Sequence, residues 1–529
     1  MRTDRQSVAS VSQSKSSPHS DEARLAPSPN VVLSALLRRQ QAAFRVEPMP
    51  ELASRLADLK ALSRLLGEHR EEIVQAICAD YGHRSRHETL LYEFVVVLDE
   101  IRHARRHLKR WMGRQRRRVN PLLYLGSRNT LMPQPLGVVG VIVPWNFPIT
   151  LSLGPLVGIF AAGNRAMVKM SERSPHLAAL LAEISPQYFA EDKLVFLADI
   201  LDDTGGMGPV FSSLPFDHLL FTGSTATGRA VMRNAAENLT PVTLELGGKS
   251  PAIVAADFPL ERAVERIMHA KLVNAGQICT SVDYVFVPRE QIDDFVTLAR
   301  HHVTRRYLGN SPDISNTSSI DTDDYTAIID DSAWRRLQYL LADARDKGAR
   351  IINLTGEAGS EDRSQSQNDS AHPSTSDSGN TQRKLAPHLL LDVTDEMLIL
   401  QQEIFGPLLP VLAYDDPQEV INYVAARPRP LALYPFTNDG ALRDRYIEQL
   451  ISGGVSVNQA LMHVGQSDLP FGGVGTSGMG HYHGREGFNT FSKLRPIYQQ
   501  GPIDSLKLLM PPYTKHTDRL LSWLIRLLR

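Results

Sequence analysis

The segment His218-Leu-Leu-Phe-Thr-Gly-Ser-Thr-Ala-Thr-Gly228 decides the fold of this chain of 529 residues. It begins as a short apolar run typical of a buried strand, turns through Thr222-Gly223-Ser224 and then opens a helix. Further short apolar runs precede and follow it, with helical segments between them; they lie at residues 138–143, 165–169, 194–197, 241–246 and 252–254. Strands that alternate with helices predict an α/β fold with a parallel sheet.

The chain before residue 119 is predicted to be helical. Leu52, Leu56, Leu59 and Leu62 repeat at helical spacing, and residues 93–111 predict a second long helix. Residues 102–118 contain nine Lys or Arg, which fits either a basic binding patch or a solvated helix face that ends in a linker. We favour the solvated face.

The uncharged stretch at residues 129–164 is long enough to suggest a membrane span. Five prolines interrupt it, and proline breaks a spanning helix. They are Pro133, Pro135, Pro144, Pro148 and Pro155. We therefore expect a strand, a loop and a buried helix in this stretch.

Length and composition limit the class of protein. A chain of 529 residues exceeds what one hydrophobic core usually supports, so two or more domains are expected. The composition, 42% hydrophobic and 22% charged, is that of a globular protein, and the net charge of −1 predicts no nucleic-acid partner. The two cysteines, Cys78 and Cys279, exclude a disulfide framework and a cysteine-rich metal site, and no metal is expected. So few cysteines fit a reducing compartment, and we expect a cytoplasmic protein.

Three segments depart from the α/β pattern. Residues 1–30 contain eight serines and no apolar secretory segment, which predicts a disordered tail, and the polar residues 356–383 predict a disordered insertion. The C-terminal tail, residues 501–529, ends in a predicted amphipathic helix at residues 516–529. Its apolar face carries Leu520, Leu521, Leu524 and Leu528, bordered by Arg519, Arg526 and Arg529. Such a helix can lie on a membrane surface, or pack on the protein or on a second subunit.

Two motifs contain a candidate nucleophile and a candidate base. Cys279 ends the phrase Asn274-Ala-Gly-Gln-Ile-Cys279, and Glu245 lies in Leu244-Glu-Leu-Gly-Gly-Lys249. An ionised thiol is a strong nucleophile and a carboxylate can activate water, so the pair could form a thioester and then hydrolyse it. A buried structural cysteine, and an ion pair of Glu245 with Lys249, are the alternatives.

Five motifs in a fixed order carry a family resemblance. They are Pro144-Trp-Asn-Phe-Pro148, Phe221-Thr-Gly-Ser224, Leu244-Glu-Leu-Gly-Gly-Lys249, Gly276-Gln-Ile-Cys279 and Glu403-Ile-Phe-Gly-Pro407. Over residues 31–500 the chain resembles the aldehyde dehydrogenase superfamily. Two phrases resemble its class 3 branch, and especially coniferyl aldehyde dehydrogenases: residues 469–484, and Glu237-Asn-Leu-Thr-Pro-Val-Thr243.

The resemblance implies a catalytic role for three residues. Cys279 would attack the aldehyde, while the side-chain amide of Asn146 and the backbone N–H of Cys279 would stabilise the oxyanion. Glu245 would activate the water that releases a carboxylic acid. The substrate would be an aromatic aldehyde such as coniferyl aldehyde, or a medium-chain apolar one. Two other outcomes stay open: transfer of the acyl group to coenzyme A, and a non-catalytic relative that keeps the fold.

The resemblance also implies a nicotinamide cofactor. The turn with Gly223, Ser224 and Gly228 follows a strand and opens a helix, which presents free N–H groups to a pyrophosphate. Lys169 and Glu172, in Lys169-Met-Ser-Glu172 with Ser171, would contact the adenosine ribose. Glu172 would repel a 2′-phosphate, which favours NAD over NADP, although both are used in the branch. The remaining expected cofactor contacts are Trp145, Glu403 and Phe405.

The domain organisation implied by the resemblance has three parts. Residues 31–118 and 136–245 would form a Rossmann-like NAD-binding domain, and residues 246–483 an α/β catalytic domain. Residues 119–135 and 484–500 would form a small β flap for assembly into a homodimer. The sequence departs from the class 3 pattern at Thr280-Ser-Val282, beside the nucleophile, and at Thr227 in the glycine turn.

Overall fold

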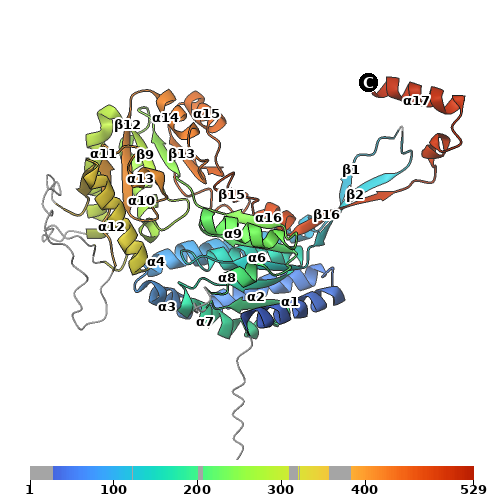
Figure 1. Cartoon of the computed structure of the whole chain (residues 1–529), viewed down its shortest axis with the longest axis horizontal. Coiled ribbons are helices and arrows are strands. Elements are labelled where there is room, and N and C mark those ends of the chain that lie inside the picture. The colour runs from blue at the N-terminus through green and yellow to red at the C-terminus, as the bar shows by residue number, and fades with distance from the viewer. Residues whose placement is uncertain (1–27, 122, 200–205, 309–319, 321, 357–382) are drawn as a thin grey trace, which may run out of the picture.

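Three β-sheets organise the computed structural model, which describes residues 28–121, 123–199, 206–308, 320, 322–356 and 383–529 (Figure 1). The predicted disordered segments at residues 1–30 and 356–383 fall almost entirely outside these residues. At their borders the structure differs from the prediction. A helix begins at Pro29, and the Arg383 side chain donates hydrogen bonds to the carbonyls of Tyr81 and Ile329.

The first sheet has the strand order β15-β7-β6-β3-β4-β5. Five of its strands are parallel: β3 (Val138–Ile142), β4 (Arg165–Lys169), β5 (Leu194–Leu197), β6 (His218–Thr222) and β7 (Val242–Glu245). The short β15 (Gly478–Met479) joins β7 antiparallel at the edge. The apolar runs in the sequence therefore predicted these five strands to within one residue at most ends, and the α/β fold is confirmed.

Helices cover both faces of this sheet. They are α1 (Pro29–Val46), α2 (Leu52–Glu68), α3 (Arg70–Tyr81), α4 (Arg86–Thr89), the π-helix η1 (Leu90–Val95), α5 (Val96–Trp111), α6 (Thr150–Ala162), α7 (Pro175–Ile184), η2 (Ser185–Gln187), α8 (Gly208–Ser212), α9 (Thr225–Ala236) and α16 (Gly484–Thr490). Side chains alternate across β3: Val139 and Val141 join the large core with α2, α5 and α6, whereas Val138 and Ile142 join a second core with α1, α8 and α9. The uncharged stretch thus forms strand, loop and buried helix, as predicted.

The second sheet has seven strands in the order β10-β11-β12-β9-β8-β13-β14. They are β8 (Pro251–Val254), β9 (Tyr284–Pro288), β10 (Arg350–Asn353), β11 (His388–Leu391), β12 (Leu408–Tyr414), β13 (Ala432–Phe436) and β14 (Gly454–Val455). All neighbours are parallel except the pair β10 and β11. The surrounding helices are α10 (Leu260–Leu272), η3 (Val273–Gly276), η4 (Arg289–Gln291), α11 (Ile292–Val303), η5 (Thr304–Leu308), α12 (Asp331–Asp346), α13 (Leu398–Gln401), α14 (Pro417–Ala425) and α15 (Gly440–Gln449).

The third sheet projects from the body as an arm of three antiparallel strands (Figure 1). It consists of β1 (Gln115–Arg117), β2 (Arg128–Pro135) and β16 (Ser492–Gln499). Two predictions for the segments in and beside this arm are corrected. Residues 115–117 form a strand rather than a linker because they pair with β2, and the first residues of the second flap segment form α16, which packs on α5 and α6. The division into three domains and the role of the arm in assembly stay predictions.

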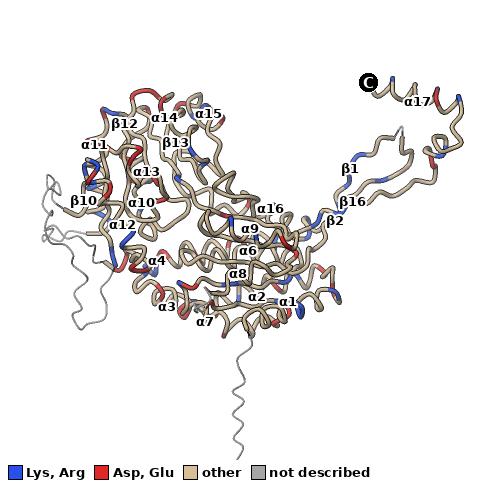
Figure 2. The backbone as a smooth tube through the Cα atoms, in the orientation of Figure 1, with Lys and Arg blue, Asp and Glu red and all other residues tan. Residues whose placement is uncertain are grey.

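The C-terminal tail extends past the arm (Figure 1). After η6 (Ser505–Leu509) it forms α17 (Lys515–Leu528), which confirms the predicted helix to within one residue. Within the part of the chain that the structure describes, no helix has the length and apolarity needed to cross a membrane. Figure 2 shows Lys and Arg interspersed with Asp and Glu over the body of the molecule.

Candidate active site

The first sheet changes direction between β3 and β6, and a cavity lies at that point. The chain runs from β3 outward through β4 and β5, then returns to add β6 and β7 on the other side. Ligands of open α/β sheets bind outside the carboxyl ends of the strands at such a switch. A cavity of about 300 Å³ is lined there by the segments that follow β3, β6 and β7.

The amino-terminal side of the second sheet closes this cavity. Cys279 precedes β9, and Glu403 and Phe405 precede β12. Eight of the twelve predicted site residues line the cavity: Trp145, Asn146, Gly223, Ser224, Glu245, Cys279, Glu403 and Phe405. The structure therefore brings together residues that lie far apart in the sequence. Lys169, Ser171, Glu172 and Gly228 are not among its lining residues.

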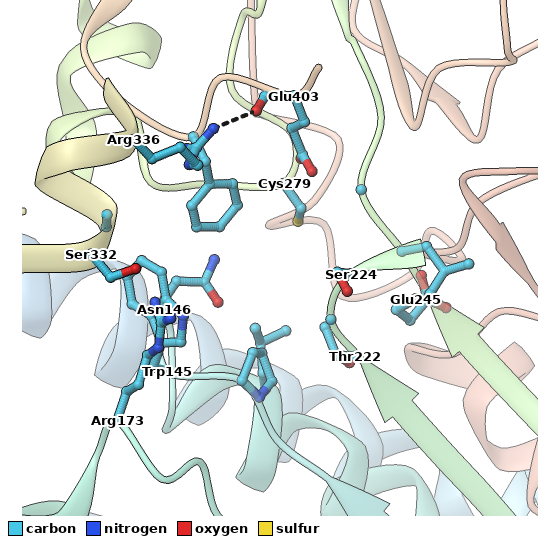
Figure 3. Close-up of a pocket in the computed structure, with 17 residues that line it drawn as sticks. Trp145, Asn146, Arg173, Thr222, Ser224, Glu245, Cys279, Ser332, Arg336 and Glu403 are labelled. Carbon is cyan, nitrogen blue, oxygen red and sulfur yellow. Dashed lines mark hydrogen bonds between the residues drawn. The ribbon is translucent and has the colours of Figure 1, made fainter. Parts of the chain in front are cut away.

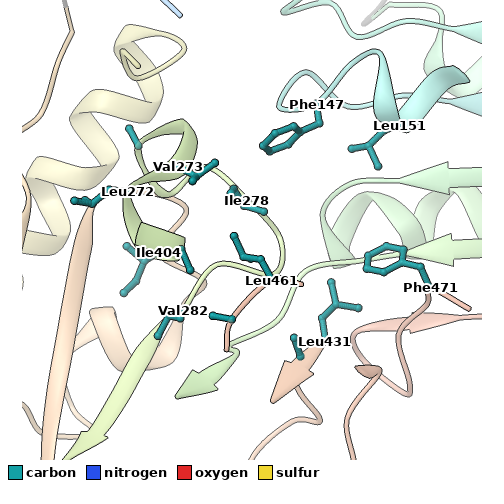
Figure 4. Packing of buried hydrophobic residues seen from close by; sticks show 14 of the residues in the cluster. Phe147, Leu151, Leu272, Val273, Ile278, Val282, Ile404, Leu431, Leu461 and Phe471 are labelled. Atoms are coloured by element: carbon teal, nitrogen blue, oxygen red, sulfur yellow. The ribbon is translucent and has the colours of Figure 1, made fainter. Parts of the chain in front are cut away.

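The loop that carries Cys279 is held in an unusual backbone conformation. Asn274 and Ala275 have φ of 52° and 51°, in the left-handed region that non-glycine residues rarely adopt. At Gly276 a β-carbon would lie 2.4 Å from the carbonyl oxygen of Gly406, so only glycine fits. The Gln277 side chain donates to the carbonyls of Asn274 and Ala327 at 2.9 and 3.0 Å. Apolar neighbours including Val273, Ile278 and Val282 pack around the loop (Figure 4).

Cys279 is a neutral thiol in this environment. Burial raises its pKa to about 12, and the nearby carboxylates of Glu403 and Glu245 act in the same direction. The backbone N–H groups of Thr280 and Cys279 work against this rise. The thiol therefore needs activation before it can act as a nucleophile.

Asn146 points into the same space as Cys279 (Figure 3). Its side chain is buried and donates to the carbonyl of Gln277, in the Cys279 loop, at 3.2 Å. The backbone carbonyl of Asn146 accepts from the side chains of Arg84, Tyr81 and Asn274 at 2.8, 3.1 and 3.2 Å. A fixed amide donor beside a nucleophile is the arrangement that stabilises an oxyanion.

Glu245 ends β7 and is 2% exposed. Neither of its carboxylate oxygens has a hydrogen-bond partner among the described residues, and burial raises its pKa well above the ordinary value. The alternative ion pair with Lys249 is wrong, because Lys249 pairs with Asp283. Glu245 thus faces the cavity as a desolvated carboxyl group with free acceptors.

The glycine turn leads from β6 into the start of α9. Ser224 caps the helix by accepting from the N–H of Thr227 at 3.2 Å. A β-carbon at Gly228 would lie 2.6 Å from Leu246, so this glycine lets the helix approach β7 closely. Gly223 and Ser224, at the start of α9, line the cavity, and the amino terminus of a helix is a position that favours an anion.

The opposite wall of the cavity is built around Glu403. Gly247 gives it room, and its Oε1 atom has no hydrogen-bond partner among the described residues. Burial raises its pKa to about 8, helped by the charge of Asp283. The Thr222 hydroxyl is also buried and has no hydrogen-bond partner among the described residues. Such polar atoms, together with the helix terminus, fit a dinucleotide with ribose hydroxyls and phosphates.

The predicted ribose residues lie beyond the cavity, at the end of β4 and directly after it. Lys169 is buried and pairs with Asp199, at 2.5 Å between Nζ and Oδ2, and lies 3.6 Å from Glu172. Ser171 accepts from the N–H of Arg173 at 3.2 Å, and Glu172 is exposed. Their role toward a cofactor stays a prediction.

Sequence reasoning missed several residues of the site. Arg336, on α12, lines the cavity and donates to the backbone carbonyl of Glu403 at 3.1 Å (Figure 3). Arg173 lies over the Trp145 ring and pairs with Asp330 at 3.2 Å. Neither belongs to a motif with chemical meaning of its own, so only spatial proximity identifies them. Conversely, the unusual residues Thr280, Ser281 and Val282 are buried and do not line the cavity.

Comparison with known proteins matches most of the chain. The model of the aldehyde dehydrogenase family matches residues 33–497. The chain is 46% identical to a probable coniferyl aldehyde dehydrogenase of Pseudomonas aeruginosa, over 92% of this chain and 95% of that protein. It is 43% identical to a coniferyl aldehyde dehydrogenase of a Pseudomonas species, over 93% and 96% respectively.

A solved structure agrees with the same assignment. The substrate-bound state of an aldehyde dehydrogenase, AldH, of Staphylococcus aureus superimposes with a TM-score of 0.81 and 31% identity, over 93% of this chain and 99% of that one. The resemblance carried by the five motifs and the Rossmann-like α/β fold are thus confirmed, and the use of NAD(P) is confirmed with membership of the family, of which a Mycobacterium tuberculosis relative is solved with NAD+. The chain belongs to the aldehyde dehydrogenase family and is an NAD(P)-dependent aldehyde dehydrogenase.

Proposed function

We propose that this enzyme oxidises an aldehyde to a carboxylic acid through a thioester on Cys279. The observation that carries the proposal is the convergence of Cys279, Asn146 and Glu245 on one cavity (Figure 3). Each supplies one required function: a nucleophile, an oxyanion donor and a base for water. Asn146 and Glu245 are buried, and low-dielectric surroundings strengthen electrostatic contacts.

In the first half of the reaction, the Cys279 thiol gives its proton to solvent water as its sulfur bonds to the aldehyde carbon. The carbonyl oxygen becomes an oxyanion, and the amide of Asn146 and the backbone N–H of Cys279 donate to it. The resulting thiohemiacetal must then lose a hydride to become a thioester. Bound NAD(P) supplies the hydride acceptor. The α9 terminus, Glu403 and Phe405 are the residues that would hold it.

In the second half, water attacks the thioester and Glu245 takes a proton from that water. A carboxylate with a raised pKa is a stronger base once ionised, which suits this role. The carbon–sulfur bond breaks, the acid leaves, and the sulfur regains a proton. Because a free hydrolytic base faces the cavity, water rather than coenzyme A is the expected acceptor.

We propose that coniferyl aldehyde or a related aromatic aldehyde is the substrate, with medium-chain apolar aldehydes as the second class. The support is the likeness over nearly the full chain to two proteins named for coniferyl aldehyde. NAD is the preferred cofactor in this proposal because Glu172 would repel the 2′-phosphate of NADP. Both cysteines are free thiols, which fits the expected cytoplasmic location.

The test is NAD and NADP reduction over a panel of aromatic and aliphatic aldehydes, with and without coenzyme A. We expect turnover with NAD that is highest for aromatic aldehydes and unaffected by coenzyme A. Cys279→Ala should abolish turnover, while Cys78→Ala serves as the matched control. Absence of turnover with every aldehyde would refute the proposal. Formation of an acyl-coenzyme A would show that coenzyme A, and not water, accepts the acyl group.

We further propose that the chain forms a homodimer through its arm and that α17 makes a peripheral membrane contact. β1 and β16 are edge strands with unpaired backbone groups, and α17 exposes Leu521, Trp523 and Ile525 beside basic residues. Sedimentation velocity should give a dimer, and liposome pelleting should fall when residues 516–529 are removed. A monomer, or equal pelleting of both chains, would overturn the respective idea.

A further inference from the structure

Two glutamates on one short segment, the half-buried Glu88 and the buried Glu93, each contact a different catalytic loop. The segment runs from α4 through the π-helix η1 and carries Glu88 and Glu93. Glu88 binds the loop of the nucleophile, and Glu93 binds the loop of the oxyanion donor. Neither glutamate lines the cavity that contains Cys279.

Glu88 fixes the start of the Cys279 loop. Its Oε2 atom accepts from the backbone N–H of Asn274 at 3.1 Å and from the hydroxyl of Thr326 at 2.6 Å. Asn274 is the first of the two residues with left-handed backbone, so Glu88 bonds the loop where its conformation is least favourable on its own. Thr326 is itself held by the N–H of Ser85 at 3.2 Å.

Glu93 fixes the loop of Asn146 at its other end. Its Oε2 atom accepts from the N–H groups of Ile149 and Thr150 at 2.9 and 2.8 Å, where α6 begins. Its Oε1 atom lies 3.2 Å from Nη1 of Arg84, and the same nitrogen donates to the carbonyl of Asn146 at 2.8 Å. Arg84 and Glu93 are both fully buried, and the Arg84 guanidinium lies between the rings of Tyr81 and Phe147.

The two loops also touch each other through these anchors. The side chain of Asn274 donates to the carbonyl of Asn146 and to the hydroxyl of Tyr81, both at 3.2 Å. Tyr81 in turn donates to the same carbonyl at 3.1 Å. The spacing of nucleophile and oxyanion donor is therefore set by one connected group of buried polar side chains.

The π-helix explains how one segment reaches both loops. Glu88 and Glu93 are five positions apart, and in a regular α-helix such residues point about 140° away from each other. A π-turn accommodates one extra residue and brings positions five apart toward the same side. The π-helix η1 begins at Leu90, after Glu88, and contains Glu93, and each carboxylate contacts one of the two catalytic loops.

We propose that Glu88 and Glu93 are positioning residues that hold Cys279 and Asn146 at their reactive separation, with η1 as the element that allows both contacts. The idea rests on the proposed function, because it assigns these two residues their roles. A misplacement of reacting groups by about 1 Å can lower the rate by about a hundredfold, so such anchors bear directly on kcat.

The experiment compares three variants of the full chain. Glu88→Met keeps the side-chain size but removes the acceptor, whereas Glu88→Gln retains an acceptor oxygen for Asn274 and Thr326. The control is Glu71→Met, which removes an exposed carboxylate that pairs with Arg86 on the neighbouring α4. For each variant kcat, KM for NAD, thermal midpoint and the rate of iodoacetamide alkylation at Cys279 are measured, with Cys78 followed separately by peptide mass spectrometry.

We expect Glu88→Met to lower kcat by about 10- to 100-fold with KM for NAD unchanged, and to change the alkylation rate of Cys279. Glu88→Gln should restore most of kcat and the parent alkylation rate, and Glu71→Met should match the parent. Equal kcat in Glu88→Met and Glu88→Gln, or a parent alkylation rate in Glu88→Met, would overturn the positioning role. If the parent enzyme itself oxidises no aldehyde, the proposed function fails, and the alkylation rates still decide whether Glu88 holds the loop.

Discussion

Gly247 and Glu403 stand so close that a β-carbon at Gly247 would lie 2.0 Å from Oε2 of Glu403. Real β-carbons do not approach an oxygen to this distance, so any larger residue must displace the Glu403 carboxyl group. We predict that Gly247→Ala raises KM for NAD by at least about tenfold, because Glu403 is proposed to hold the nicotinamide ribose. Steady-state kinetics with NAD as the varied substrate measures this.

The matched control for that substitution is Gly67→Ala in α2. No atom lies within 4 Å of a β-carbon at this position, and alanine is favoured over glycine in a helix by about 0.5–1 kcal/mol. Its KM for NAD should equal the parent value while its stability rises slightly. If Gly247→Ala behaves in the same way, the close approach has no role in cofactor binding.

Asn146→Ala removes the proposed oxyanion donor. We expect kcat to fall by about 10²–10³-fold, which corresponds to about 2.7–4 kcal/mol of barrier. The exposed Asn422, whose side chain accepts from Gln418 on the surface of α14, supplies the control Asn422→Ala. A fall of less than threefold in Asn146→Ala, about 0.6 kcal/mol, would assign the oxyanion to other donors.

Glu172→Gln tests the preference between the two cofactors. The exposed carboxylate would repel a 2′-phosphate, while Lys169 beside it is already paired with Asp199. We predict that the ratio of kcat/KM for NADP to that for NAD rises by about tenfold, or about 1.4 kcal/mol. An unchanged ratio would mean that specificity is set elsewhere on the ribose site.

Glu100 makes stability depend on pH. It is fully buried, and burial raises its pKa to about 8, with the charge of Asp99 acting in the same direction. The folded chain keeps this proton up to about pH 8, whereas the unfolded chain releases it near pH 4.5. Unfolding therefore releases a proton from Glu100 in this window. The contribution of protonated Glu100 to the free energy of unfolding is lost as the pH rises from about 4.5 to 8.

Glu100→Gln should remove that contribution. Between pH 5 and pH 8 the parent is expected to lose stability relative to the variant by roughly a few kcal/mol, since each pKa unit is worth about 1.4 kcal/mol. Urea midpoints at several pH values measure the difference. His483 lies 3.8 Å from Glu100, and burial lowers its pKa to about 4, below the pH range of the measurement. If the urea midpoints of the parent and of Glu100→Gln change in parallel with pH, Glu100 does not titrate in this range.

The strands of the first sheet were predictable because burial on both faces leaves a strong local signal. β4 and β5 occupy the predicted residues because each is a short apolar run between polar or turn-forming neighbours. β1 carried no such signal. Gln115–Arg117 has no apolar residue, and it becomes a strand only through its pairing with Leu131, Thr130 and Asn129 of β2.

The site residues were predictable only where they belong to a short contiguous motif with a known chemical role. Cys279, Glu245 and Asn146 each lie in such a motif, and the structure brings them to one cavity. Asp199 and Arg336 do not lie in such a motif. Their partners Lys169 and Glu403 are distant from them in sequence, so only the structure shows the contacts. Glu88 and Glu93 were hidden for another reason: a helical period of 3.6 residues cannot reveal a π-turn, so residues 93–111 predict an ordinary helix.

The thioester on Cys279 is the central claim, and Glu245→Gln tests it most directly. Without the base for water, the acyl group should accumulate when the variant is mixed with NAD and coniferyl aldehyde. Mass spectrometry of the quenched protein should find one acyl group, on the peptide that contains Cys279, together with a burst of NADH. A burst without an adduct at Cys279, or an adduct at Cys78 instead, would contradict the account.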